Sequence, residues 1–216
     1  MNDMIKSTIH FFALMFGMIT CIQAQTITEV QIGKQVWTKS NLNTDRFRNG
    51  DPIPQAKNRA EWAAASEKKQ PVWCYYGYSP AYGKKYGKLY NWYAVNDPRG
   101  LAPTGWHIPS ISEWHQLIDF SGKENMAGLA LKSSTGWQKG NNANNSTGFS
   151  ALPGGTCTEF GYFDGKILET GRWWSSTPTD FDDWPWLFGF DYNREFVFSS
   201  DYYRAGCGMS VRCVKD

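Results

Sequence analysis

The chain has 216 residues, and its 22 basic and 20 acidic side chains give a formal net charge of +2 at pH 7. A near-neutral charge without a basic stripe argues against nucleic acid as a partner. The length suits one domain with a sizeable core. Eleven Trp and eleven Tyr residues supply large surfaces that a fold can bury or use to stack on sugar rings.

The first residues have the pattern of a secretory signal peptide. Lys6 precedes an apolar run over 9–22, and Ala24 is a small residue before a polar one. The run is too short to span a bilayer, and no later run suggests a membrane span. We therefore expect residues 1–24 to be removed and a domain of residues 25–216 to be exported to the periplasm, the cell surface or the medium. A buried N-terminal helix is the alternative.

Local patterns in the first half predict a hairpin, a helix and a strand. The run 27–42 has two β-prone segments around Gly33, which is typical of a hairpin. The Ala-rich segment 59–69 predicts a short helix. The aromatic segment 71–78 predicts a strand, whereas 89–96 is ambiguous between strand and helix.

Two helices are expected in mid-chain, at 111–120 and 124–132. After Gly136 the chain is rich in Gly, Asn, Ser, Thr and aromatic residues and has few helical periods. Short strands between loops are expected at 148–155, 171–177, 186–193, 195–200 and 209–216. Helices early and strands late predict an α+β fold in a single domain.

The stretch 105–118 holds His107 and His115 with Glu113 between them, which raises the question of a metal or acid–base site. Ser110 and Glu113 have the spacing of a capping box, in which each side chain accepts a hydrogen bond from the other residue's amide. His115 is expected on the solvent side of the helix, and His107 lies before the helix. Since the spacing is not HExxH, the pattern favours a structural role for Glu113 and no metal.

Four cysteines follow the predicted cleavage site: Cys74, Cys157, Cys207 and Cys213. An even number in an exported chain favours disulfides over free thiols, and the residues alone leave three pairings open. None is in a CxxC arrangement, so a zinc site is disfavoured. Cys21 raises a lipoprotein alternative, but no small residue lies just ahead of it as in a lipobox.

Aromatic residues in the last third are the best lead to a binding site. The candidate ligand-binding residues, in or beside loops rich in Asp, Asn and Ser, are Trp184, Tyr192, Tyr202, Tyr203, Asp182 and Asp183. Aromatic rings beside hydrogen-bonding groups are typical of a platform for sugar rings or a partner's side chains. Packing in a small β-rich core is the alternative. Alternation along the strand places Trp186, Phe188 and Phe190 on one inward face.

The acidic loop around these aromatics admits two further interpretations. Asp180, Asp182 and Asp183 could hold calcium through oxygen ligands. They could also supply the paired carboxylates of a glycoside hydrolase. The spacing is not that of an EF-hand, and a solvated acidic loop is the plainer interpretation, so no cofactor is expected.

Several blocks of this sequence, in order, are "YGKLYNWYAVNDPRGLAPTGWHIPSISEW", "GFSALPGG", "WWSST" and "GMSVRCVKD". Together they resemble the Fibrobacter succinogenes major paralogous domain family over about residues 30–216. More distantly, "GWHIPSISEW" is similar to a "GFRLPTEAEWE" block of formylglycine-generating enzymes. That resemblance implies a C-type-lectin-like fold with paired N- and C-terminal strands, two helices flanking the sheet, and a loop-rich insertion that carries the binding face.

The resemblance also bears on the chemistry of the chain. Formylglycine-generating oxidases use a close pair of reactive cysteines ahead of their final block, whereas here Cys207 alone closely precedes Cys213. The oxidase reaction therefore lacks its nucleophile. The Glu-Pro-Asn or Gln-Pro-Asp triplets of calcium-dependent lectins do not occur in this sequence.

The resembled fold further implies disulfides and a binding face. Because its chain ends meet, it implies a Cys74–Cys213 bridge, which leaves Cys157 to pair with Cys207. Its loops before the final strand lie together at one end, and here these are 177–186 and 199–208. We therefore expect one exposed aromatic patch. Its members are Trp184, Tyr202 and Tyr203, with Asp182 and Asp183 at the edge.

Three functions are compatible with this sequence. The favoured one is an exported, non-catalytic binding or interaction module whose partner is a glycan or a cell-surface protein. The second is a secreted enzyme, either hydrolytic or oxidase-like, although no catalytic motif is present. The third is a structural component of the cell envelope.

Overall fold

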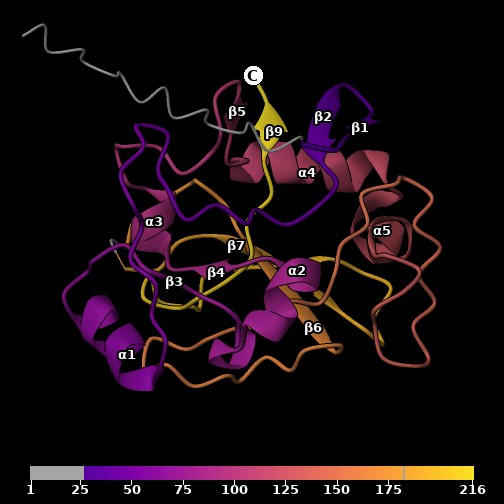
Figure 1. Cartoon of the computed structure of the whole chain (residues 1–216). Helices are drawn as coiled ribbons and strands as arrows, with labels where there is room; N and C mark the ends of the chain where they lie inside the picture. Colours follow the sequence, from indigo (N-terminus) through magenta and orange to yellow (C-terminus); the bar gives the residue numbers. More distant parts are fainter. Residues whose placement is uncertain (1–26, 182) are drawn as a thin grey trace, which may run out of the picture.

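The computed structural model describes residues 27–181 and 183–216, which form a mixed α/β fold (Figure 1). The predicted signal peptide and Asp182 lie outside the described residues. The helices are α1 (Arg59–Glu67), α2 (Gly83–Tyr86), α3 (Trp92–Val95), α4 (Ile111–Phe120) and α5 (Lys123–Leu131), and two 3-10 turns cover Tyr76–Tyr78 and Pro80–Tyr82. No helix in this described part is both long and apolar enough to cross a membrane.

An early hairpin and the last strand share one antiparallel sheet. Its strands, in hydrogen-bonded order, are β1 (Glu29–Ile32), β2 (Gln35–Thr38), β9 (Val214–Lys215) and β5 (Trp106–His107). The predicted hairpin is confirmed, and its turn contains Gly33 with a φ of 60°, a conformation that glycine adopts without strain. Trp37 of β2 pairs with Val214 of β9. The two ends of the described chain are therefore joined.

Helices α4 and α5 confirm the two helices predicted in mid-chain, and α4 lies alongside this sheet (Figure 1). The predicted capping box at Ser110 and Glu113 is also confirmed. The inner face of α4 is buried, and His115 is exposed on the outer face as expected. A cluster that we call the helix-side core includes Ile32, Trp37, Trp114, Leu117, Ile118, Ala127, Phe149, Trp173, Phe188, Phe190 and Val214.

A central sheet has buried side chains on both of its faces. It consists of β6 (Thr170–Trp174), β7 (Leu187–Asp191) and β8 (Phe198–Ser200), in that order. Trp173 and Phe188 belong to the helix-side core. Their neighbours Trp174 and Leu187 belong to a second cluster, which we call the central core. Phe188 and Phe190 share the helix-side core, as the alternation predicted, whereas Trp186 is only half-buried. Leu187 on the other face of β7 is also buried, so both faces of the strand point to a core.

Three predicted segments are shorter or different in the structure. The strand expected at 71–78 is limited to β3 (Trp73–Cys74), which pairs with β4 (Leu89–Tyr90), because 3-10 turns follow it. The ambiguous segment 89–96 contains both β4 and helix α3. The segment 148–155 is not a strand, and its backbone makes only isolated bridges, at Ala151 and Gly155.

A buried polar cluster ties the layers together. Arg212 is fully buried and donates from Nε to Asn41 Oδ1 at 2.8 Å. Its other nitrogens donate to the carbonyl oxygens of Thr38, Phe149 and Ser150. Asn41 Oδ1 also accepts from Trp173 Nε1 at 2.9 Å. Burial lowers the pKa of Arg212 to about 9, which leaves the guanidinium charged at pH 7.

Neither predicted disulfide is present, since the four described cysteines are buried free thiols. The Cys74–Cys213 bridge is wrong because Cys213 lies in the central core with Trp73. Cys74, the next residue of β3, lies in a different cluster. The Cys157–Cys207 bridge is wrong because Cys157 pairs with Gly208 in antiparallel register. Directly opposed residues share a face, so Cys207 points to the other side.

Candidate functional site

The two loops predicted to carry the binding face lie side by side. The Ala205 amide donates to the Asp183 carbonyl oxygen at 2.8 Å. The central sheet explains this placement, because 177–186 leads into β7, 199–208 begins within β8 and continues beyond it, and Leu187 pairs with Ser200. Both loops therefore lie at one end of that sheet. We call these two segments the loop face.

The predicted aromatic patch is only partly present on the loop face. Tyr202 is 83% exposed, as expected. Tyr203 is half-buried and packs against the central core. Trp184 is also half-buried, and Arg204 Cζ lies 5.4 Å from the centre of its ring. The expectation of large exposure is therefore wrong for Trp184 and Tyr203, whose rings pack against neighbouring side chains.

A second exposed ring on the loop face escaped the sequence analysis. Phe181 is 70% exposed, and its carbonyl oxygen accepts from the Trp184 amide at 3.1 Å within one turn. An apolar ring inside an acidic loop is the signal that could have identified it. Phe181 and Tyr202 thus lie on the two joined loops, where both rings are open to solvent.

Charged and polar side chains flank the loop face. Asp183 Oδ1 accepts from the Tyr93 hydroxyl at 2.9 Å and lies 3.6 Å from Lys69 Nζ. Burial and the hydrogen bond to Asp183 raise the pKa of Tyr93. Arg204 Nε lies 3.8 Å from Glu159 Oε1. Lys69, Tyr93 and Glu159 come from distant parts of the chain, so only the fold places them here.

Tyr192 lies apart from the loop face. It follows β7 at the opposite end of the strand, and five residues at about 3.3 Å each separate it from the loop that enters β7. Its carbonyl oxygen accepts from the buried Lys132 Nζ at 3.2 Å, and its ring packs against the helix-side core. The prediction that Tyr192 belongs to the binding site is therefore wrong. Another candidate, Asp182, is outside the described residues.

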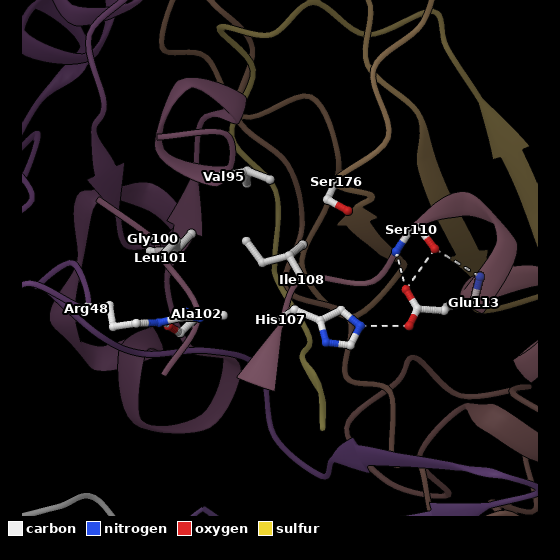
Figure 2. Close-up of a pocket in the computed structure, with 10 residues that line it drawn as sticks. All are labelled: Arg48, Val95, Gly100, Leu101, Ala102, His107, Ile108, Ser110, Glu113 and Ser176. Carbon is white, nitrogen blue, oxygen red and sulfur yellow. Dashed lines mark hydrogen bonds and ion pairs between the residues drawn. The ribbon is translucent and has the colours of Figure 1, made fainter. Parts of the chain in front are cut away.

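A second candidate site is an open pocket of about 310 Å³ near the start of α4 (Figure 2). Apolar side chains of Val95, Leu101, Ala102 and Ile108 line part of it, and Arg48, His107, Ser110, Glu113 and Ser176 supply its polar groups. Arg48 holds one wall in place, because its guanidinium donates to the carbonyl oxygens of Ala102 at 3.0 Å and Trp106 at 2.7 Å.

His107 lies between two carboxylates at this pocket. Its Nε2 is 2.7 Å from Glu113 Oε1, and its Nδ1 is 2.8 Å from Asp216 Oδ1. Partial burial disfavours the charged imidazole, but the hydrogen bonds and charges of Glu113 and Asp216 outweigh it and raise the pKa of His107. Burial also opposes ionisation of Glu113, but hydrogen bonds from Ser110 and His107 outweigh it and lower the pKa of Glu113.

This geometry occupies both nitrogens of the imidazole. Ser110 Oγ donates to Glu113 at 2.7 Å (Figure 2), so Ser110 and His107 do not form the nucleophile–base pair of covalent catalysis. The two carboxylates contact different ring nitrogens. Among residues 27–181 and 183–216, no group of three or more His, Cys, Asp or Glu side chains is placed to hold a metal. The arrangement orders the start of α4.

The pairing of His107 with Glu113 should stabilise the fold over a defined pH range. A histidine with a raised pKa contributes fully below its ordinary value of about 6.5, and the contribution is lost as the pH rises through the raised pKa. A glutamate with a lowered pKa contributes above its ordinary value of about 4.3, and the contribution is lost as the pH falls through the lowered pKa. The pair is therefore strongest between these two ordinary values.

We expect His107→Gln to reduce the free energy of unfolding more at about pH 5.5 than at about pH 8.5. Chemical denaturation of both proteins at the two pH values measures this difference. His115→Gln is the matched control, because His115 lies exposed on α4, the helix that holds Glu113, and its replacement should change the free energy of unfolding by less than about 0.5 kcal/mol at either pH. An equal loss for His107→Gln at both pH values would contradict the assignment.

The sequence matches one known protein family. A family model described as the Fibrobacter succinogenes major domain matches residues 30–215. No curated protein and no solved structure matches the chain significantly. The matched range contains the loop face and the capping box of α4. Because the match covers nearly all of the described residues, the chain belongs to the Fibrobacter succinogenes major domain family.

Proposed function

We propose that this chain is an exported, non-catalytic binding module with a C-type-lectin-like fold, and that its loop face binds a glycan. The paired strands at the two ends of the described chain, β2 and β9, support this fold. The two helices α4 and α5 and the long irregular segment between α5 and β6 also agree with it. Because one fold can serve many functions, the proposal of glycan binding rests on the residues of the loop face.

The observation that carries the proposal is the pair of exposed rings on two joined loops. Phe181 is 70% exposed and Tyr202 is 83% exposed, whereas large apolar side chains in a stable fold are mostly buried. Sugar rings stack on such aromatic faces, and their hydroxyl groups need hydrogen-bonding partners at the rim. Asp183 and Arg204 lie two residues along the chain from Phe181 and Tyr202, so each loop also carries a charged hydrogen-bonding group.

A non-catalytic role is supported by the state of the reactive side chains. Both nitrogens of His107 are engaged by carboxylates. Burial and the nearby Glu159 carboxylate raise the pKa of the Cys207 thiol. A nucleophilic cysteine needs the opposite shift, because the thiolate is the reactive form. These features favour binding over the hydrolytic and oxidative alternatives.

Glycan-array screening of the wild-type protein, followed by calorimetry with the best ligand, tests the proposal. Tyr202→Ala should weaken binding by about 1–3 kcal/mol while changing stability by less than about 0.5 kcal/mol. Phe120→Ala is the matched control, because Phe120 is an exposed ring on α4 and should leave affinity unchanged. Binding should persist in a calcium chelator, since no cofactor is expected.

Three outcomes would overturn the proposal. Binding of a cell-surface protein through Tyr202, with no glycan bound, would favour an interaction module. The absence of any glycan or protein ligand would favour a structural envelope component. Turnover of a bound glycan would favour a hydrolase, and in that case alanine at Asp183 should abolish product formation.

A further inference from the structure

Two of the four buried cysteines lie next to each other. Cys74 of β3 and Cys157 belong to one core cluster, together with Ala56, Trp62, Val72 and Leu89. Both side chains are buried, and the Cys157 thiol is close enough to add to the effect of burial in raising the pKa of the Cys74 thiol. Neither of the pairings that the resembled fold implied joins these two residues.

Regular backbone pairing holds each cysteine in place. Cys74 pairs with Leu89 across β3 and β4. The backbone of Cys157 exchanges two hydrogen bonds with Gly208, at 3.0 and 2.7 Å. A Cβ atom at Gly208 would lie 2.7 Å from the Trp62 ring and 3.1 Å from Cys157 Cβ, so no larger residue fits on that side. The fold itself therefore fixes the position of each cysteine in this cluster.

Tyr78 closes the remaining side of this pair. Its hydroxyl donates to the Gly161 carbonyl oxygen at 2.8 Å and lies 3.9 Å from Cys157 Sγ. Its ring packs against Phe163 at a centroid distance of 5.0 Å. A disulfide formed behind this cover would be shielded from soluble reductants.

We propose that Cys74 and Cys157 form the structural disulfide of this domain, and that Cys207 and Cys213 remain thiols. A low-molecular-weight disulfide, such as oxidised glutathione, is the oxidant. One protein thiolate attacks the oxidant and releases the first small thiol. The second protein thiolate attacks the mixed disulfide and releases the other. The two cysteines lose two electrons and two protons, and the oxidant gains them as two thiols.

Burial of the two thiols determines when the disulfide can form. Removal from water raises the pKa of the Cys74 thiol, and the neighbouring Cys157 thiol adds to this effect. The thiolate that must attack the oxidant is therefore scarce in the folded protein. The bond should form while the chain folds, when both cysteines are still accessible, and the native reduced protein should react slowly with oxidised glutathione.

A Cys74–Cys157 disulfide would restrain one end of the 199–208 loop. Cys157 is hydrogen-bonded through its backbone to Gly208, the last residue of the 199–208 loop. A covalent link from Cys157 to β3 fixes that end of the loop to the body of the domain. Gly208 is next to Cys207, the partner that the resembled fold implied for Cys157, so the proposed bond would act on the same end of the loop.

Peptide mapping tests the proposal directly. The full chain is reduced, unfolded and refolded in a glutathione redox buffer, and free thiols are alkylated before digestion with trypsin. The cysteines fall in separate tryptic peptides: 7–34, 70–84, 140–166, 205–212 and 213–215. We expect 70–84 linked to 140–166, with Cys207 and Cys213 alkylated. Alkylated Cys74 and Cys157 in the refolded protein, or a link from either to Cys207 or Cys213, would overturn the proposal.

Thermal unfolding with and without reductant provides an independent measurement. The oxidised wild type should melt about 5–10 °C above the reduced protein. Cys207→Ala should retain this redox-dependent shift, and Cys157→Ala should lose it. If Cys157→Ala retained the shift, another pair of cysteines would be responsible and the proposal would fail.

Discussion

Replacing Trp114 with alanine is expected to lower the free energy of unfolding by about 3–5 kcal/mol. The indole is fully buried on the inner face of α4. It stacks on Phe188 at 5.0 Å and lies 5.0 Å from the Trp37 ring. These contacts join α4 to the central sheet and to the β1–β2 hairpin, so the cavity would open where three layers meet.

Two matched variants make this prediction specific. Trp114→Phe should be clearly milder, because a smaller aromatic ring still fills part of the space and the buried Trp114 Nε1 has no hydrogen-bond partner among the described residues. Phe120→Ala on the same helix removes a ring that is 64% exposed and should change stability by less than about 0.5 kcal/mol. Urea denaturation measures all three. A loss of less than about 1 kcal/mol for Trp114→Ala would contradict this packing.

The second large effect is expected at Arg212. Arg212→Met should lower the free energy of unfolding by about 3–5 kcal/mol. Three backbone carbonyl groups would lose the guanidinium that they bond, and each unsatisfied buried group costs about 1–3 kcal/mol. Relief from burying the charge offsets part of this loss. Those carbonyls belong to Thr38, Phe149 and Ser150.

The geometry of the guanidinium distinguishes this role from a simple need for positive charge. Arg212→Lys should be nearly as destabilising as Arg212→Met, because one ammonium group cannot reach acceptors on several sides. Arg194→Met is the control, since Arg194 is exposed and makes one surface ion pair with Asp191. Denaturation curves that placed Arg212→Lys at wild-type stability would show that charge alone suffices.

Features encoded by neighbouring residues were predictable from the sequence. The capping box at Ser110 and Glu113, the hairpin at Gly33 and helix α1 all depend on residues within a few positions of each other. The α+β class followed from the order of these elements. Alternation along β7 correctly placed Phe188 and Phe190 on one inward face, but it did not reveal that the opposite face, with Leu187, is buried as well.

Features that depend on the packing of distant segments could not be predicted. His107 and Glu113 were expected to have separate roles, yet the turn between β5 and α4 brings them to 2.7 Å. Asp216 joins them only because β9 pairs with β5. The disulfide partners were misassigned for the same reason: the face on which a cysteine lies depends on strand register. The loops 177–186 and 199–208 were correctly expected to meet, although the exposure of Trp184 and Tyr203 was not.

Hydrogen–deuterium exchange of the protein, alone and saturated with the glycan selected on the array, tests the central claim most directly. If the loop face binds the glycan, residues 177–186 and 199–208 should gain protection, and Tyr202→Ala should remove most of it. The segment 100–113, which contributes much of the lining of the His107 pocket, should exchange at the same rate in both states. Protection confined to 100–113, with none on the loop face, would contradict the proposed binding site.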